Sequence, residues 1–178
     1  MKNKAVFLDR DGVLNRAIVR DGKPYPPASL SEFEILPGTK EALDKLKAAG
    51  YLLILVTNQP DVGRGTQQKS IVEEMHEVLR TILPLDEIYV CYHGYDGECE
   101  CRKPQPGMLL AAAIEFKIDL KRCFMIGDRT KDMEAGKAAN CKTILLKSSH
   151  TEDIRETPDA EIKELSEFLK IVPFLDKR

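Results

Sequence analysis

Five short apolar segments, each followed by a longer polar or amphipathic stretch, constrain the fold of this chain more than any other feature of its sequence. They cover residues 5–8, 52–57, 87–91, 123–126 and 142–146. Strands that are apolar along nearly their whole length are typical of a parallel sheet with helices packed on both faces. The alternation therefore predicts an α/β fold, a doubly wound parallel sheet of the Rossmann-like kind.

The segments between these strands place apolar residues at helical spacing, as Ala42, Leu43 and Leu46 do after the turn at Pro37 and Gly38. Two stretches do not fit the alternation: the proline-rich residues 15–36, and residues 147–158, which are polar and expected to be mobile. We expect helices over residues 39–49, 68–83, 107–116, 132–139 and 160–169.

Size and charge narrow the possible functions. The chain has 178 residues, against roughly 150 for an average domain, so we expect one domain over residues 1–178 and no cap domain. Lys and Arg number 27 against 29 Asp and Glu, and the net charge of −2 gives no general case for binding nucleic acid. No apolar run reaches the roughly 20 residues of a membrane span, and the first residues do not resemble a signal peptide. We expect a cytoplasmic protein without membrane or nucleic-acid partners, and a monomer is favoured.

Polar residues gather after the ends of the predicted strands, where open parallel sheets bind ligands. Asp9 and Asp128 each follow a strand and offer the hard oxygen ligands that Mg²⁺ prefers. With the cation present, one of these carboxylates could attack phosphorus and form an aspartyl phosphate. The whole set is Asp9, Asp11, Gly12, Thr57, Asn58, Gln59, Lys103, Asp128, Arg129 and Asp132.

Other members of this set suit the same chemistry. Asp11, two residues after Asp9, could protonate the leaving oxygen and then deprotonate the attacking water. The hydroxyl of Thr57 and the ammonium of Lys103 could bind the oxygens of the transferred group, and Gly12 lets the backbone approach it. A lone Asp-x-Asp could equally be turn chemistry, but the agreement of four separate segments favours phosphoryl transfer.

These segments resemble, in order, the motifs of the haloacid dehalogenase superfamily of phosphatases. The closer similarity is to the D-glycero-D-manno-heptose 1,7-bisphosphate 7-phosphatases and the related histidinol-phosphate phosphatases, over roughly residues 4–146. The segments are Leu8-Asp9-Arg10-Asp11-Gly12-Val13, Val56-Thr57-Asn58-Gln59, Cys101-Arg102-Lys103-Pro104, Pro106-Gly107-Met108 and Gly127-Asp128-Arg129-Thr130-Lys131-Asp132.

The resemblance implies a role for each matching residue. Asp9 would be the nucleophile and Asp11 the acid and base, with Thr57 and Lys103 on the phosphoryl group. Magnesium would be held by Asp9, the carbonyl of Asp11 and Asp128. Asp132 would orient the magnesium waters or Lys103. The substrate would be bound by Gly12, Asn58, Gln59, Arg64, Arg102 and Arg129.

A compact group of cysteines and a histidine precedes Lys103. Cys91, His93, Cys99 and Cys101 supply three thiolates and an imidazole, enough to close a tetrahedral zinc site. Because protein ligands would fill all four positions, the zinc should be structural and should brace this loop. The phosphatases named above carry such a loop. The remaining cysteines, Cys123 and Cys141, are expected in the core, and His76 and His150 on the surface.

The substrate is the least constrained expectation. Arg64 and Arg102 favour a second anionic group and hence a heptose bisphosphate, from which the 7-phosphate would be removed. Pro60 and Asp61 differ from the usual heptose-enzyme pattern, and the short zinc-loop spacing resembles the histidinol-phosphate branch. Histidinol phosphate or another small sugar phosphate therefore stays the alternative substrate. A zinc-stabilised phosphosugar-binding module is the non-enzyme alternative.

Overall fold

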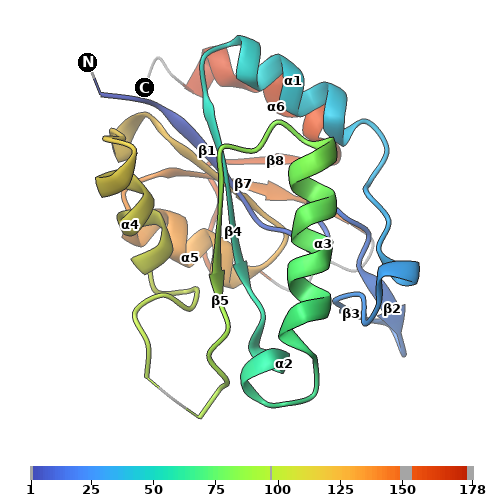
Figure 1. The fold of residues 1–178 in the computed structure, drawn as a ribbon. Coiled ribbons are helices and arrows are strands. Elements are labelled where there is room, and N and C mark those ends of the chain that lie inside the picture. The colour runs from blue at the N-terminus through green and yellow to red at the C-terminus, as the bar shows by residue number, and fades with distance from the viewer. Residues whose placement is uncertain (1, 97, 149–153, 176–178) are drawn as a thin grey trace.

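The computed structural model describes residues 2–96, 98–148 and 154–175 and has a parallel sheet at its centre (Figure 1). The strand order is β5-β4-β1-β6-β7-β8, and each neighbouring pair is parallel. All five predicted strands are confirmed to within one residue. The strands are β1 (Ala5–Leu8), β4 (Leu52–Asn58), β5 (Glu87–Cys91), β6 (Phe124–Gly127), β7 (Lys142–Leu146) and β8 (Ala160–Ile162).

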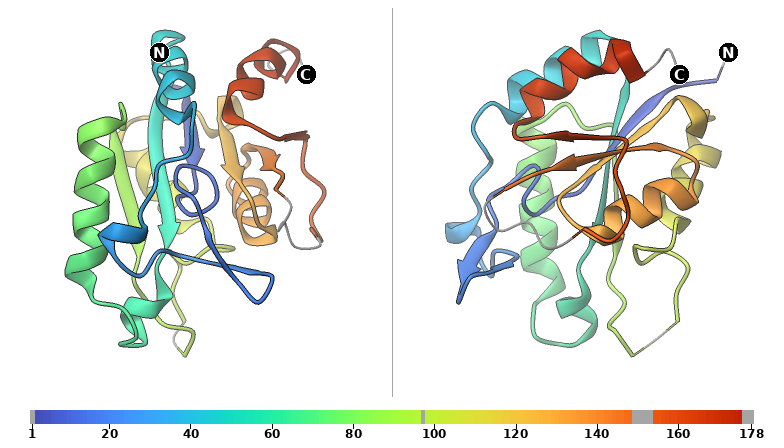
Figure 2. Two further views of the ribbon diagram at one scale, coloured as in Figure 1. Left: turned by 90° about the vertical axis from the view of Figure 1, so that its right-hand side faces the viewer. Right: turned by 180° about the vertical axis from the view of Figure 1, so that it is seen from behind.

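Helices cover both faces of the sheet, as the apolar strands predict. α1 (Thr39–Ala48), α3 (Lys69–Ile82) and α6 (Leu165–Leu175) contribute to the core on one face, and α4 (Gly107–Glu115) and α5 (Thr130–Ala138) cover the other. α1 and α6 lie side by side (Figure 2). Strand β1 shows why both faces are apolar: Val6 and Leu8 enter one core, while Ala5 and Phe7 enter the other. The doubly wound α/β fold is confirmed.

The proline-rich stretch after β1 forms an antiparallel hairpin of β2 (Ile18–Arg20) and β3 (Lys23–Tyr25), followed by the short 3-10 helix η1 (Leu30–Glu32). The hairpin lies near the carboxyl end of β1 (Figure 1). Two other short helices are α2 (Pro60–Gly63), directly after β4, and η2 (Leu120–Arg122), before β6. Within the described part of the chain, none of the helices has the length and apolar character needed to cross a membrane.

The helix predicted over residues 160–169 is wrong at its start. Ala160–Ile162 is strand β8, which pairs with Ile144, Leu145 and Leu146 of β7, and helix α6 begins only at Leu165. The pairing satisfies backbone groups that β7 would otherwise leave open at the sheet edge. A strand of three residues is too short to show a period in the sequence. Of the stretch expected to be mobile, residues 147–158, the part from 149 to 153 lies outside the described residues.

Candidate active site

A cavity of about 260 Å³ opens at the carboxyl ends of β1, β4 and β6. Asp9 follows β1, Asp128 follows β6, and Lys103 lies in the loop between β5 and α4. The topology thus brings residues from distant parts of the sequence together at one edge of the sheet, as the sequence predicted. The predicted residues that line the cavity are Asp9, Asp11, Asn58, Arg64, Arg102, Lys103, Arg129 and Asp132.

Lys103 is buried between two carboxylates on the cavity floor. Its Nζ lies 2.6 Å from Oδ1 of Asp9 and 2.6 Å from Oδ1 of Asp132, and it also donates to the carbonyl of Val56 at 2.8 Å. Burial alone would lower the pKa of Lys103, but Asp132 and Asp9 outweigh burial and raise it. The lysine is therefore a fixed positive charge that holds one oxygen of Asp9 in place.

The floor carries more negative charge than Lys103 can balance. Asp9, Asp128 and Asp132 are all buried, with carboxylate oxygens within 4.8 Å of one another. Burial, followed by the charges of Asp9 and Asp132, raises the pKa of Asp128 to about 8. The buried Oδ1 of Asp128 accepts no hydrogen bond from the described residues. A hard divalent cation would satisfy this oxygen and reverse the pKa shift, so the donor set fits Mg²⁺.

Glycine is required at position 12. Its φ of 88° lies in the left-handed region, and a Cβ there would meet Oδ2 of Asp128 at 2.4 Å. Any larger residue would displace the Asp128 carboxylate. Gly12 therefore leaves room for Asp128, and the approach of its backbone to phosphate stays a prediction.

Asn58 and Gln59 contact other site residues. Asn58 donates to the carbonyl of Lys103 at 2.9 Å and accepts from its amide at 3.0 Å, which fixes the backbone of that lysine. Gln59, only 3% exposed, donates from Nε2 to Thr57 Oγ1 and to Asp11 Oδ2, both at 3.0 Å. Both were predicted to bind substrate, which stays a prediction; in the structure their side-chain amides contact Lys103, Thr57 and Asp11.

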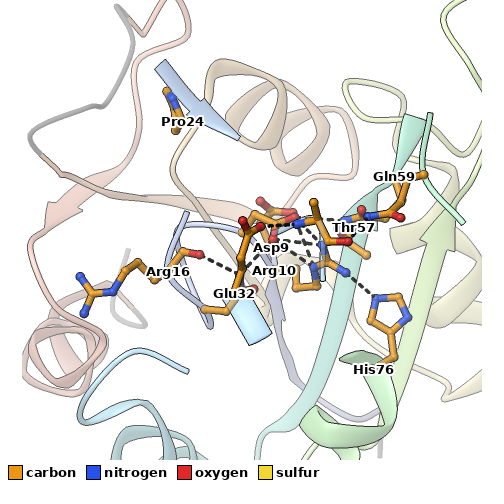
Figure 3. A network of polar contacts seen from close by, with 12 residues as sticks. Asp9, Arg10, Arg16, Pro24, Glu32, Thr57, Gln59 and His76 are labelled. Carbon is orange, nitrogen blue, oxygen red and sulfur yellow. Dashed lines mark hydrogen bonds and ion pairs between the residues drawn. The ribbon is translucent and has the colours of Figure 1, made fainter. Parts of the chain in front are cut away.

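Asp11 belongs to a second polar network through Arg10, whose contact with His76 is drawn in Figure 3. Arg10, buried beside it, bonds both carboxylate oxygens and also lies 3.2 Å from Nε2 of His76. Burial would raise the pKa of Asp11, but Arg10 and the hydrogen bonds from Asn15 and Gln59 lower it. The surface position predicted for His76 is wrong, since the ring is 5% exposed. His150, predicted to be on the surface as well, lies outside the described residues.

Cations surround Tyr95 at the opening of the cavity. The ring centroid lies 5.8 Å from the guanidinium carbon of Arg64, 5.7 Å from that of Arg102 and 5.5 Å from Nζ of Lys131. We call Tyr95, Arg64, Arg102 and Lys131 together the cationic collar. They come from the end of α2, the cysteine loop, the segment before α4 and the start of α5. Sequence reasoning missed Tyr95, which belongs to no pattern that links it to the motifs. It also gave no role to Lys131, although this residue lies in the segment Gly127-Asp128-Arg129-Thr130-Lys131-Asp132.

Two residues beside the collar complete the opening. Asp61 forms an ion pair of 3.2 Å with Arg64, which offsets part of the positive charge. Arg129, whose Nε lies 3.8 Å from Oδ1 of Asp128, donates to the carbonyl of Pro24 in the hairpin at 3.2 Å. Arg129 thereby ties the hairpin to the start of α5, and Pro24 and Tyr25 form part of the cavity wall.

The four predicted zinc ligands lie together. His93 Nδ1 is 3.5 Å from the sulfur of Cys91 and 3.3 Å from that of Cys101, and the sulfurs of Cys91 and Cys99 are 3.7 Å apart. Bonds of about 2.3 Å in a tetrahedron imply ligand separations of roughly 3.7 Å, so the spacing fits zinc. Burial is the main reason that the pKa of the Cys91 thiol is raised to about 12. A metal cation would favour the thiolate instead.

The cysteine loop packs tightly on its neighbours. A Cβ at Gly63 would meet the amide nitrogen of Gly94 at 2.3 Å, and one at Gly107 would meet the carbonyl of Glu100 at 2.2 Å. Arg102 also donates to the carbonyl of Gly94. The loop is thus fitted against the end of α2, which carries Arg64, and the start of α4. The remaining cysteines, Cys123 and Cys141, are buried in the core as predicted.

Comparison with known proteins gives a consistent result. The family model for HAD-hydrolase-like proteins matches residues 100–168. D-glycero-beta-D-manno-heptose-1,7-bisphosphate 7-phosphatase from Pasteurella multocida is 39% identical over 95% of this chain and 96% of its own length. The corresponding alpha-heptose enzyme from Burkholderia mallei is also 39% identical, over 82% of this chain and 80% of its own.

A solved structure agrees with these sequence relatives. The crystal structure of D,D-heptose 1,7-bisphosphate phosphatase from B. bronchiseptica, complexed with magnesium and phosphate, has a TM-score of 0.80. It is 27% identical to this chain, with 99% of both chains covered. The chain therefore belongs to the haloacid dehalogenase superfamily of phosphatases, and within it to the family of the heptose-1,7-bisphosphate 7-phosphatases.

Proposed function

We propose that this protein is a Mg²⁺-dependent phosphatase that removes the 7-phosphate of a D-glycero-D-manno-heptose 1,7-bisphosphate. The observation that carries the proposal is that one cavity is lined both by Asp9 and Asp132, which with Asp128 form the buried acidic cluster, and by the cationic collar at its opening. A bisphosphate can place its reacting phosphoryl group on the floor and its other phosphate at the collar. The names of the relatives supply the identity of the sugar.

Two metal sites belong to the proposal. Asp9, Asp128 and the backbone carbonyl of Asp11 would hold Mg²⁺. Asp132 would lie next to this site and pairs with Lys103. When bound, this cation would balance the acidic floor and polarise the phosphoryl oxygens. The cysteine and histidine cluster would hold a zinc ion that only stabilises the loop, because its four protein ligands leave no open position for substrate.

In the first step, Asp9 attacks the phosphorus of the 7-phosphate. Lys103 holds Oδ1 of Asp9, which leaves Oδ2 as the attacking atom. A bond forms between this oxygen and phosphorus while the bond from phosphorus to the sugar oxygen breaks. The leaving oxygen takes a proton from Asp11. Lys103 and the hydroxyl of Thr57 face the negative charge of the transferred group.

In the second step, water releases the phosphate from Asp9. The Asp11 carboxylate takes a proton from the water, whose oxygen bonds to phosphorus as the bond to Asp9 breaks. Asp11 is then protonated again and ready for the next leaving group. The form of Asp11 that pairs with Arg10 is the ionised, proton-accepting one.

The collar favours a bisphosphate over histidinol phosphate. The distal end of histidinol phosphate carries an amine and an imidazole, which are cationic or neutral and would gain little from Arg64, Arg102 and Lys131. A second phosphate would attract all three. Asp61 beside Arg64 weakens this preference without reversing it, since one carboxylate faces three cations.

Phosphate release from purified protein with Mg²⁺ tests the proposal. We expect kcat/KM for heptose 1,7-bisphosphate to exceed that for histidinol phosphate by at least about tenfold, which corresponds to about 1.4 kcal/mol of transition-state stabilisation. A preference of this size for histidinol phosphate would assign the protein to the other branch. No Mg²⁺-dependent hydrolysis across a panel of phosphomonoesters would instead support the phosphosugar-binding module.

A further inference from the structure

Arg10 is a fully buried cation that the proposed chemistry does not use. Its side chain is 0% exposed and is among the largest that the protein buries completely. A guanidinium removed from water is unfavourable unless its donors find partners with good geometry. The partners of Arg10 therefore indicate what the residue does.

Arg10 directs two of its three nitrogens at Asp11. Nε lies 3.2 Å from each oxygen of the Asp11 carboxylate, and Nη2 lies 3.1 Å and 3.0 Å from Oδ1 and Oδ2. Because the four distances are nearly equal, the carboxylate lies crosswise to the two nitrogens and each nitrogen is shared between both oxygens. The guanidinium thus holds the carboxylate at both oxygens and restricts its rotation. A lysine at this place would keep the charge but would lose the control of orientation.

His76 of α3 holds the third nitrogen. Its Nε2 lies 3.2 Å from Nη1 of Arg10, and Figure 3 shows the two side chains joined in this way. A guanidinium can only donate, so Nε2 must accept and the ring is neutral, with its proton on Nδ1. Because His76 is buried as well, it cannot turn away without leaving Nη1 of Arg10 without this acceptor.

The remaining contacts of Asp11 complete the enclosure. Oδ1 accepts from Nδ2 of Asn15 and Oδ2 accepts from Nε2 of Gln59, both at 3.0 Å. The Asp11 side chain keeps 13% of its surface exposed and lines the cavity. Donors thus surround the carboxylate on the protein side and leave it reachable from the substrate side.

We propose that Arg10 is a positioning residue that fixes the Asp11 carboxylate for proton transfer, and that His76 fixes Arg10 in turn. This inference rests on the proposed function, because it takes Asp11 as the proton donor and acceptor. Arg10 does not line the cavity and so touches no reacting atom. Its loss should slow the steps that move a proton and should spare phosphate binding and the attack by Asp9.

Leaving groups that differ in their need for a proton test this inference. With Arg10→Lys, the single-turnover rate of phosphoryl transfer from heptose bisphosphate should fall by roughly 100-fold, because the sugar oxygen needs a proton to leave. The first-turnover burst from p-nitrophenyl phosphate should stay within about threefold of the wild-type rate, because nitrophenolate leaves unprotonated. Its steady-state turnover should slow, since water attack still needs the base.

Matched variants separate positioning from general damage. Asp11→Asn should show the same leaving-group pattern more strongly. His76→Leu should show it more weakly, and His76→Gln should restore much of the rate because an amide oxygen can accept from Arg10. Arg80→Lys is the control, since Arg80 also lies on α3 but pairs with Glu87 near the surface. If Arg10→Lys fails to fold, the two His76 variants decide the question.

Equal slowing of both first turnovers in Arg10→Lys or His76→Leu, or no slowing of either, overturns the inference. Such a result is distinct from failure of the proposed function. The latter would appear in the wild-type protein itself, as absence of Mg²⁺-dependent hydrolysis of heptose bisphosphate. That result would not depend on whether Arg10 is present.

Discussion

The floor of the cavity and the cationic collar both consist of charged residues, but the two regions are built in opposite ways. On the floor, Asp9, Lys103 and Asp128 are between 2% and 8% exposed and follow strands or lie between them. In the collar, Tyr95 is 55% exposed and the Arg64 side chain 49%, and both stand on loops or helix ends. The sheet holds the floor rigidly, whereas the collar sits where sequences can change without disturbing the core.

The difference in burial also sets how much each charge contributes. Removing one partner from a buried ion pair strands the other charge in a low dielectric, which costs roughly 3–5 kcal/mol. An exposed pair is screened by water and salt and contributes about 1 kcal/mol or less. We therefore expect single changes on the floor to abolish the chemistry and single changes in the collar only to shift substrate preference.

The strongest test of the floor is Asp9→Asn. Loss of the nucleophile should lower kcat by about 10⁴-fold or more. Stability should change little, for two reasons. Burial raises the pKa of Asp9 to about 6 and so disfavours its charge, and Lys103 keeps a second buried carboxylate, Asp132 at 2.6 Å, when Asp9 loses its charge. Phosphate release and thermal unfolding measure the two effects.

Asp44→Asn on the exposed face of α1 is the matched control and should change neither quantity. A variant at Asp9 that retains more than a few per cent of the activity would contradict its role as nucleophile. A variant that loses both activity and stability would show that the charge of Asp9, and not only its reactivity, holds the floor together.

The second test removes the zinc ion that we expect in the cysteine loop. Cys101→Ser should lower the zinc content from one ion per chain and lower stability by about 4 kcal/mol when zinc exceeds its Kd a thousandfold. KM for the bisphosphate should rise with it, because the loop packs on Gly63 beside Arg64. Elemental analysis, unfolding and kinetics would check this. Unchanged metal content or unchanged unfolding would argue against the site.

The floor was largely predictable from the sequence, and the reason is topological. Parallel strands bring their carboxyl ends to one edge, so Asp9 and Asp128 had to lie close together once the strands were recognised. Their hard oxygens then indicated the chemistry. The same reasoning brought Lys103 to this edge, and the cysteine spacing predicted that the four proposed zinc ligands lie together. In each case a local pattern, combined with a single fact about the fold, was sufficient.

The rest depends on contacts that no local pattern encodes. His76 has an ordinary place in an amphipathic helix, and only the fold shows that it faces Arg10. All of α4 and β6 lies between Tyr95 and Lys131 in the sequence, so their proximity depends on loop conformation. Strand β8 forms because β7 offers an open edge, and the three residues of β8 carry no pattern that would predict this pairing.

His76 gives a test of intermediate size, since it is buried like the floor but contacts the Asp11 network through Arg10. Burial and the charges of Arg10 and Arg80 lower its pKa from 6.5 to about 4, against an opposing effect of Asp11. The neutral ring is thus the folded form, and its stabilisation is present above pH 6.5 and lost as the pH falls toward 4. The loss should reach about 3 kcal/mol at most.

Unfolding by denaturant at several pH values, in wild type and in His76→Gln, would measure this loss. The difference between the two proteins isolates the histidine from the carboxylates that titrate in the same range. We expect the wild type to lose stability relative to the variant between pH 6.5 and 4. Parallel curves would mean that the ring is not held neutral and that Arg10 lacks this acceptor.

The smallest expected effect belongs to the collar. Lys131→Met should raise KM for the bisphosphate by about fivefold at most, since an exposed charge contributes about 1 kcal/mol or less, and should leave kcat unchanged. Lys137→Met, in the last turn of the same helix, is the control. An equal rise in KM for a monophosphate would contradict a role in binding the distal phosphate.

A double variant tests whether the collar cations act independently. If they do, adding Arg64→Ala to Lys131→Met should multiply the two effects on KM. A smaller combined effect would mean that Tyr95 couples them, and the collar would then resemble the floor more than its exposure suggests.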